Sequence, residues 1–440
     1  MRPSPNQRDY AVTFVLQRTH RSCVPTAGYS SLIDGDGRPP TRYYPCIPAA
    51  GYSSRLVYRA IYRKGKYPYL CKRSKKLPIG FTQNTYSSSM ITDRDTATTL
   101  PHLKVIYTGG TIGMVQDIET GALKAFQFDY LREHVPELDQ LHCTFDIEQC
   151  DPPIDSSAIT PDLWIWLGEM IQREMHQYDG FVILHGTDTM AYTASALSFM
   201  LRDLDRPVIL TGSQLPIGRL RTDGKENLIT AFEIALARRA DGSPMIPEVA
   251  VYFEDYLYRG NRTLKYSAEH FEAFASPNYP HLAFAGIDIK YSPSAIGFDE
   301  PALSQAWRPA FDGHVVVLKL FPGLSASLLD HILHTPDLRG VVLETFGSGN
   351  APTSAAFLSA IKGAVARGIT IVNVTQCYSG SVVMGRYETG NVLSQTGVIG
   401  GGDMTTESAT TKLMYLLAQD LSPEEVAHLM QVSLRGELTA

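Results

Sequence analysis

The chain has 440 residues, of which 44% are hydrophobic, so two or three domains with sizeable cores are expected. No uninterrupted apolar run reaches the ~18 residues of a membrane-spanning helix. The first 22 residues lack the apolar stretch of a signal peptide, and the six cysteines show no CxxC or CxxH pairing. These features argue against a membrane protein, a disulfide scaffold and a zinc site, and they favour a reducing, cytoplasmic compartment.

The net charge of −6 is the sum of a basic and an acidic region. Residues 1–100 hold 16 Lys+Arg against 5 Asp+Glu, whereas the other 340 residues hold 23 against 40. The first region is rich in Tyr, Arg, Pro and Ser and shows no sustained helical period. We therefore expect residues 1–101 to be an irregular, poorly ordered basic extension, separate from an acidic globular part.

Two patterns stand out in the extension. An imperfect repeat, CVPTAGYSS from Cys23 and CIPAAGYSS from Cys46, has too few copies for a solenoid. The cluster RKGKYPYLCKRSKK from Arg63 mixes basic residues with tyrosines, as nucleic-acid-binding segments do. A solvated charge run is the better interpretation, so a nucleic-acid partner is not expected.

From residue 102 onward, short apolar runs alternate with helical patterns. The apolar runs predict strands over residues 104–108, 181–184, 207–211 and 248–253. The helical patterns predict helices over residues 161–177, 189–204 and 225–239. Continuous apolar strands separated by helices are typical of parallel strands covered on both faces, so this part predicts a doubly wound, mostly parallel α/β sheet.

A smaller α/β domain is predicted after a Pro- and Ser-rich segment without periodicity. Its strands and helices alternate over residues 314–320, 325–334, 340–346, 353–367 and 370–375, and two helices close the chain. The last of these helices begins with a capping box, Ser422 with Glu425, and a proline between them. Four regions are thus expected: the extension 1–101, an N-terminal domain 102–289, a linker 290–312 and a C-terminal domain 313–440.

Three predicted loops before helices carry hydroxyl and carboxylate groups. TGGTIG occupies residues 108–113, IDSS occupies 154–157, and HGTDT occupies 185–189. One such loop is an ordinary tight turn, but open α/β sheets bind their ligands at the carboxyl ends of the strands. Three together predict one polar site, where glycines let a small substrate lie against the main chain.

A hydroxyl nucleophile needs a base at neutral pH. His185 follows an apolar strand directly, and a histidine there is more often packed or hydrogen-bonded than catalytic. Lys265, in LYRGNRTLK, follows the strand at 248–253 and serves as a base only if desolvation lowers its pKa. A surface lysine is the simpler interpretation, so the residues alone leave the base open.

The motifs together resemble those of type I, cytoplasmic L-asparaginases. The similar stretches are YTGGTIGM, DSS, HGTDTMAYTASALSFML, TGSQLP, RTDGKENL, YRGNRTLK, FASPN, GSGNAP and GVIGGGDMT. They run from about residue 102 to 436 and leave the extension uncovered. The resemblance implies hydrolysis of L-asparagine to L-aspartate and ammonia, with a larger N-terminal and a smaller C-terminal α/β domain, and with no metal or organic cofactor.

The resemblance also implies roles for individual residues. Thr111 corresponds to the nucleophile of the family. Thr187, Asp188 and Lys265 correspond to the group that relays the proton, and the Asp188 position also meets the α-ammonium of the substrate.

Further residues implied by the resemblance bind the substrate. Asp155 and Ser156 match positions that hold its amino-acid end. Asn350, in GSGNAP, matches a residue that a neighbouring subunit offers to the site, so a homodimer or homotetramer is expected.

The sequence departs from the family pattern at several positions. Ala122 stands near the place of a tyrosine in the loop after TGGTIG of many bacterial relatives. Leu264 and Glu344 fall where some regulated bacterial members have Thr and Arg near a second asparagine site, although Cys377 matches. The resemblance therefore leaves open how a lid contributes and whether the chain is under allosteric control.

Two other functions compete with an asparaginase. One is the asparaginase-like glutaminase subunit of the archaeal tRNA-dependent amidotransferase, which also carries an extension before TGGTI. The extension of this chain lacks the alternating strand pattern of a small barrel, and TGSQLPIGRLRTDG is typical of type I asparaginases. The other is a binding protein that keeps the fold without catalysis, which the intact set Thr111, Thr187, Asp188 and Lys265 argues against.

A chain that begins at Leu100 should retain full activity, because the cut removes neither a motif nor a complete α/β unit and keeps the strand predicted at 104–108. Turnover of the truncated and full-length proteins should be compared after circular dichroism has shown that both are folded. A folded but inactive truncated chain would mean that the extension completes the site.

Overall fold

The computed structural model describes residues 100–116, 123–125, 135–301, 308–385 and 388–439. The repeat and the basic cluster of the extension, and Ala122, lie outside these residues. Within them, no helix is long and apolar enough to cross a bilayer.

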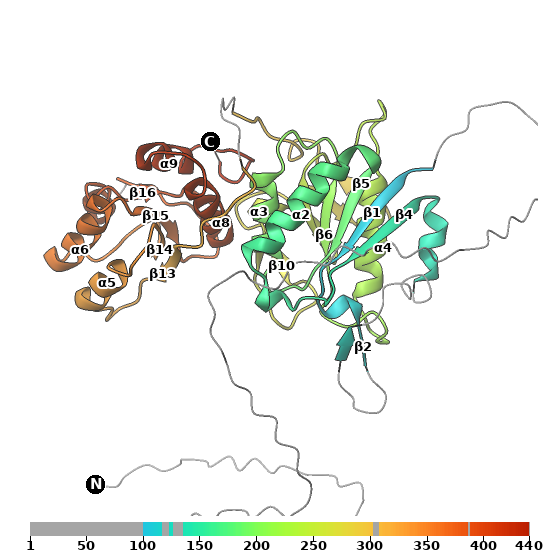
Figure 1. Ribbon diagram of the computed structural model, residues 1–440, viewed down its shortest axis with the longest axis horizontal. Helices are drawn as coiled ribbons and strands as arrows, with labels where there is room; N and C mark the ends of the chain where they lie inside the picture. The colour runs from blue at the N-terminus through green and yellow to red at the C-terminus, as the bar shows by residue number, and fades with distance from the viewer. Residues whose placement is uncertain (1–99, 117–122, 126–134, 302–307, 386–387, 440) are drawn as a thin grey trace, which may run out of the picture. The chain divides into compact units, whose positions relative to one another are not determined.

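The larger sheet of the described chain has eight strands in the order β12-β11-β8-β7-β6-β5-β1-β4. Figure 1 labels β6, β5, β1 and β4 of this sheet. Their bounds are β1 His102–Tyr107, β4 Thr144–Gln149, β5 Gly180–Leu184, β6 Val208–Thr211, β7 Val249–Phe253, β8 Tyr256–Arg259, β11 Ala283–Ala285 and β12 Ile289–Tyr291. Strands β4, β1, β5, β6 and β7 are parallel. Strands β8, β11 and β12 continue the sheet in antiparallel fashion. The carboxyl ends of the five parallel strands therefore meet at one edge, where the polar loops begin.

Helices cover both faces of this sheet (Figure 1). Their bounds are α2 Pro161–Glu174, α3 Met190–Met200 and α4 Gly224–Leu236. Along β5, Val182 and Leu184 belong to the core that includes α4, whereas Phe181 and Ile183 belong to the core that includes α2 and α3. Since successive side chains point to opposite faces, β5 is buried on both sides, which explains its continuous apolar run.

The second sheet is smaller and entirely parallel, in the order β13-β14-β15-β16. Its strands are β13 Val315–Lys319, β14 Gly340–Thr345, β15 Thr370–Thr375 and β16 Ile399–Gly400. Helices α5 Ala326–Leu333 and α6 Ala355–Ala366 share a core with one face, and α8 Thr406–Leu417 and α9 Pro423–Met430 share a core with the other. The capping box predicted at Ser422 and Glu425 is present at the start of α9.

Short elements complete the described chain. They are the 3-10 helices η1 Thr111–Gly113, η3 Pro136–Leu141, η4 Ser156–Ala158, η5 Met175–Gln177 and η6 Gly260–Arg262, the helix α7 Glu388–Ser394, and the strand pairs β2 Met114–Gln116 with β3 Leu123–Ala125 and β9 Leu264–Lys265 with β10 Phe274–Ala275.

The predicted fold class is confirmed, and every strand and helix predicted between residues 104 and 375 is present with ends that differ by a few residues. Strands β4, β8, β11 and β12 were not predicted. Strand β12 includes residues 290 and 291, so the larger sheet extends into the segment expected to be a linker. Strands β4 and β12 have partly exposed faces, and β8 ends in a buried arginine, so none of them carries the continuous apolar run that marks the central strands.

Candidate active site

The loop after β1 contains two glycines because the backbone of two other loops lies against it. A Cβ atom at Gly109 would lie 2.0 Å from the Ile154 carbonyl oxygen, and one at Gly110 would lie 2.5 Å from Cα of Gly186. Both glycines also have positive φ angles, +139° and +92°. The contacts bring together the loops of Thr111, Asp155 and Thr187, which the sequence predicts to share one site.

The Lys265 side chain contacts two other side chains of the predicted site directly. The Lys265 Nζ atom lies 2.7 Å from Thr187 Oγ1 and 2.7 Å from Asp188 Oδ1. The Lys265 side chain is 16% exposed and the Asp188 side chain is 62% exposed. The amine is therefore held inside the loops, while the carboxylate beside it stays open to a charged ligand.

Lys265 reaches this position by an indirect path. Strand β8 pairs antiparallel with β7 and leads the chain away from the carboxyl edge of the sheet. The chain then turns at η6 and returns as β9, whose Lys265 pairs with Phe274 of β10. The returning strand delivers the amine to the start of α3, where Thr187 and Asp188 lie.

Thr187 also contacts a residue to which the sequence analysis assigned no role. Its Oγ1 donates to Oε1 of Gln214 at 3.3 Å, and the Gln214 amide donates to the backbone oxygen of His270 at 2.9 Å. The backbone N–H of Gln214 donates to Asp223 Oδ2 at 2.7 Å. Burial raises the pKa of Asp223 despite the N–H donors of Gln214 and Leu215.

The sequence does carry a signal for Gln214. It lies in TGSQLP, directly after a buried strand, at the same edge as the other loops. Gln214 and Asp223 were not predicted as site residues. An amide is neither a nucleophile nor a base, and the Asp223 carboxylate lies nine residues from Gln214 in the sequence. Their contacts orient the Thr187 hydroxyl, which accepts from Lys265 and donates to Gln214.

Asp155 and Ser156 shape the third loop. Asp155 Oδ1 accepts from the backbone N–H of Ser157 at 2.9 Å and from its hydroxyl at 2.8 Å, and these bonds hold the pKa of Asp155 below its usual range. Ser156 is 4% exposed, and its carbonyl accepts from Thr189 Oγ1 at 2.7 Å. A Cβ atom at Gly186 would lie 2.5 Å from Ser156 Oγ, so this hydroxyl packs against the Thr187 loop.

Two predicted site residues have different surroundings. Thr111 begins η1 directly after Gly110 and is partly exposed. Asn350 follows β14 of the smaller sheet, and its backbone exchanges hydrogen bonds with Phe346. Loops that leave the larger sheet thus place five of the seven predicted residues, the β9–β10 pair places Lys265, and Asn350 follows a strand of the smaller sheet.

His185 is a packed residue, as the sequence favours. It is 1% exposed, its Nδ1 lies 2.7 Å from the Gly186 carbonyl oxygen, and its Nε2 lies 2.9 Å from Thr193 Oγ1. Trp164 Nε1 donates to the same Thr193 oxygen at 3.0 Å. A neutral ring with its proton on Nδ1 satisfies every partner, and burial lowers the pKa of His185 to about 4.

Among the described residues, no group of three or more His, Cys, Asp and Glu side chains is arranged to hold a metal ion. The loops themselves offer hydroxyls, one amine, carboxylates and main-chain N–H groups.

Comparison with known proteins relates this arrangement to one family. The family described as "Asparaginase, N-terminal" matches residues 102–296, and the "Glutaminase/Asparaginase C-terminal domain" matches residues 314–430. L-asparaginase 1 of Escherichia coli (strain K12) is 46% identical over 344 residues, which cover 76% of this chain and 97% of that protein.

Two further similarities extend the comparison. The 60 kDa lysophospholipase of Mus musculus is 40% identical over 363 residues, which cover 77% of this chain and 62% of that protein. The crystal structure of L-asparaginase I from Vibrio cholerae O1 biovar eltor is 42% identical, with a TM-score of 0.70, and the match covers 78% of this chain and 100% of that one.

The chain therefore belongs to the asparaginase family. As a member of it, the protein is an amidohydrolase, and the resemblance to type I enzymes is confirmed.

The buried His185 should make the protein less stable in mild acid. Because the folded-state pKa of about 4 lies below the ordinary value of 6.5, the unfolded chain binds the extra proton between these values. Stability should therefore fall as the pH drops below 6.5, by about 2 kcal/mol between pH 6.5 and pH 5 at about 1.4 kcal/mol per pH unit.

Denaturant unfolding at several pH values measures this loss. His185→Gln, which cannot gain the proton, should lose about 2 kcal/mol less than the wild type over the same range. The control is His331→Gln on the exposed side of α5. Equal acid sensitivity of His185→Gln and the wild type would show that His185 is not responsible.

Proposed function

We propose that the protein is an L-asparaginase, which hydrolyses L-asparagine to L-aspartate and ammonia in the cytoplasm. The observation that carries the proposal is the position of the Lys265 amine, 2.7 Å from both Thr187 Oγ1 and Asp188 Oδ1. The loop of Thr111 lies against the loop of Thr187 through the contact of Gly110 with Gly186. Family membership supports the same reaction.

In the proposed reaction, Thr111 Oγ attacks the side-chain carbonyl carbon of asparagine. The hydroxyl proton passes through Thr187 and Lys265 to the amide nitrogen, which leaves as ammonia when the C–N bond breaks. Water then attacks the ester on Thr111, the acyl–oxygen bond breaks, and the proton returns to the threonine as aspartate departs.

The negative charge on the carbonyl oxygen needs stabilisation during both attacks. Main-chain N–H groups of the glycine-rich loop are the proposed donors, and loss of one such donor costs roughly 10²–10³ in rate. Each step uses side chains and main chain of the protein, so the proposal includes no metal or organic cofactor.

The charged end of asparagine is bound separately from the reacting amide. The exposed carboxylate of Asp188 is the proposed partner of the α-ammonium group. Asp155 and Ser156 hold the rest of the amino-acid end, and the hydrogen bonds from Ser157 keep Asp155 ionised.

The assembly and the division into domains are part of the proposal. We infer an N-terminal domain that includes β12 and so runs beyond residue 289, and a C-terminal domain at 313–440, in a homodimer or homotetramer. The two separate sheets and their cores support the division. Asn350 would then serve the site of a neighbouring subunit.

Lys265→Met should lower turnover by about 10²–10⁴-fold, because it removes the amine but keeps most of the stem. Asparagine should still bind through Asp155, Ser156 and Asp188, so calorimetric titration should detect binding. Thr111→Ala should lose turnover in the same way, through loss of the nucleophile.

Lys290→Met, at an exposed lysine on β12, is the control for the change in charge. Thermal unfolding and gel filtration should show that the fold and the oligomer survive in all variants. Near-wild-type turnover of a folded Lys265→Met protein would contradict the proposed relay.

The enzyme should strongly prefer asparagine to glutamine. A site that grips the α-amino and α-carboxylate groups fixes the position of the side-chain amide, and one added methylene misplaces it, at a cost of up to about 10²-fold in rate. Ammonia release should be measured with both amides over a concentration series.

The same assay separates the proposal from its rivals. Comparable kcat/KM for the two amides would contradict the preference. Ammonia release from free asparagine by the isolated chain excludes a subunit that needs a tRNA-bound partner, and binding without turnover would indicate a non-catalytic protein.

A further inference from the structure

A segment at residues 434–439 follows α9 and has no regular secondary structure, yet residues 434–438 are all buried. Leu434 is 4% exposed and Glu437 is 0% exposed. Buried backbone outside helices and sheets needs other hydrogen-bond partners, because unpaired peptide groups are costly. The partners of the 434–439 segment therefore show what it is attached to.

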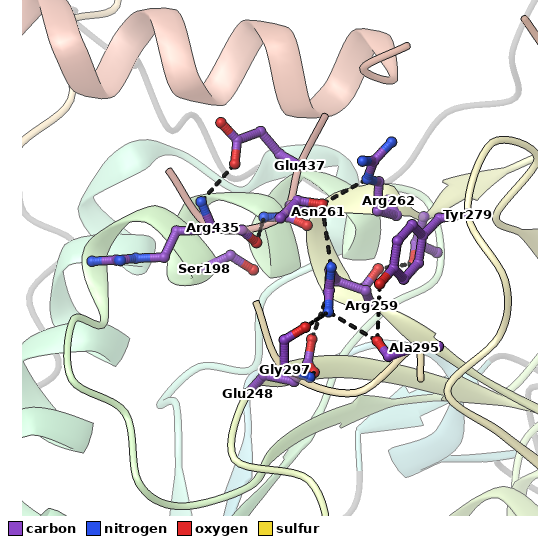
Figure 2. Close-up of polar contacts among 12 residues, drawn as sticks. Ser198, Glu248, Arg259, Asn261, Arg262, Tyr279, Ala295, Gly297, Arg435 and Glu437 are labelled. Carbon is purple, nitrogen blue, oxygen red and sulfur yellow. Dashed lines mark hydrogen bonds and ion pairs between the residues drawn. The ribbon is translucent and has the colours of Figure 1, made fainter. Parts of the chain in front are cut away.

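The carbonyl groups of the segment bind the turn that precedes Lys265 (Figure 2). Asn261 Nδ2 donates to the Arg435 oxygen at 2.9 Å, and Arg262 Nε donates to the Gly436 oxygen at 2.6 Å. Arg259 Nη1 adds a longer bond to the Gly436 oxygen at 3.4 Å. Side chains at the end of β8 and in η6 thus donate hydrogen bonds to two successive carbonyl groups of the segment.

Arg259 is itself fixed by residues that flank the strands of the larger sheet. Its Nε donates to Glu248 Oε2 at 2.7 Å, and its Nη2 donates to the carbonyl oxygens of Ala295 and Gly297 at 3.0 and 2.8 Å. The guanidinium carbon also lies 4.4 Å from the centre of the Tyr279 ring. A guanidinium bound on so many sides cannot move aside without breaking several charge-assisted hydrogen bonds.

A buried ion pair holds the segment on its other side. Glu437 and Lys412 are both 0% exposed, and their charged atoms lie 2.5 Å apart. Burial raises the pKa of the Glu437 carboxyl, but the Lys412 ammonium and the N–H groups of Leu434 and Arg435 outweigh it and lower the pKa. Removing one member of such a pair leaves a buried charge without a partner.

Asp403 connects the end of the segment to η6. It accepts from the backbone N–H and the hydroxyl of Thr439 at 2.8 and 2.6 Å, and it lies 2.9 Å from Arg262 Nη1. The segment and the turn are therefore joined both directly and through a shared carboxylate.

The position of η6 along α3 determines where the Lys265 amine lies. Gly260 lies beside the middle of α3, where an added Cβ would be 3.2 Å from Ala194 Cβ and from Ser198 Oγ. Lys265, three residues beyond Arg262, contacts Thr187 and Asp188 at the start of the same helix. A shift of the turn along α3 would therefore shift the amine.

We propose that the 434–439 segment is a positioning element for Lys265, which acts by fixing η6 against α3. The proposal rests on the role proposed above for the Lys265 amine. None of the segment's residues touches Thr187 or Asp188 in the described contacts, so its effect reaches the chemistry only through the turn.

Gly436→Ala is the substitution that tests this most directly. Gly436 has φ +71°, and a Cβ there would lie 2.3 Å from Arg259 Nη1 and 3.2 Å from Phe298 Cβ. The alanine must therefore push the segment away from Arg259 and η6. We expect kcat to fall about 10–100-fold, because small misplacements of a catalytic group are costly, while KM changes less than about threefold.

Gly242→Ala is the matched control. Gly242 has a similar φ of +83°, but an added Cβ meets nothing within 4 Å. This variant carries the same backbone strain without the clash, and its kcat should equal that of the wild type. A similar loss in both variants would assign the effect to strain and overturn the proposal.

A double-mutant cycle with Lys265→Met separates positioning from general damage. If Gly436→Ala acts through the amine, it should change the residual turnover of the Lys265→Met protein by less than about twofold. The proposal would be overturned if the losses of turnover caused by the two substitutions multiply in the double variant. It would also be overturned if Gly436→Ala raises KM and leaves kcat unchanged. Wild-type turnover of Lys265→Met would refute the proposed relay itself, whereas a disabled Lys265→Met with a normal Gly436→Ala would refute only the role of the segment.

Thr439→Val provides a second variant in case Gly436→Ala does not fold. It removes the hydroxyl that donates to Asp403 and keeps the shape of the side chain. We expect a several-fold loss of kcat that is likewise absent in the Lys265→Met background. An unchanged kcat in a variant whose melting temperature has fallen would show that the segment only stabilises the fold.

Discussion

The polar edge of the larger sheet depends on how closely two loops approach each other. Strands β1 and β5 are neighbours, with Tyr107 opposite Leu184, and their loops leave the sheet side by side. Gly110 and Gly186 let these backbones come into contact. A side chain at Gly110 would force the loops apart and change the separation of Thr111 and Thr187. The distance between the two hydroxyls therefore depends on glycine, which has no Cβ atom.

Strands buried on both faces could be predicted from the sequence, because most positions along them are apolar. Strand β4 could not, since its residues alternate between half-buried and exposed at the edge of the sheet. Strands β8, β11 and β12 are short and antiparallel, and β11 and β12 have three residues each. Their pairing comes from the fold around them, which a local pattern does not contain.

The loops with Thr111, Asp155 and Thr187 could be predicted as one site, because parallel strands bring their carboxyl ends together. The position of Lys265 required the resemblance to a family, since 77 residues and a reversal of direction separate it from Asp188. No sequence motif predicts the contacts of Gln214 or the hydrogen-bond partners of Arg259. They depend on which loops meet after the sheet has formed.

The link between η6 and the 434–439 segment has a consequence for the order in which the enzyme is made. Asn261 and Arg435 are 174 positions apart, so the ribosome completes all eight strands of the larger sheet long before the carbonyl that Asn261 binds exists. Domains fold as units during synthesis, N-terminal first. The hydrogen bonds that hold η6 against residues 435 and 436 can therefore form only at the very end of synthesis, after the strands that carry Asn261 and Arg262 have been made.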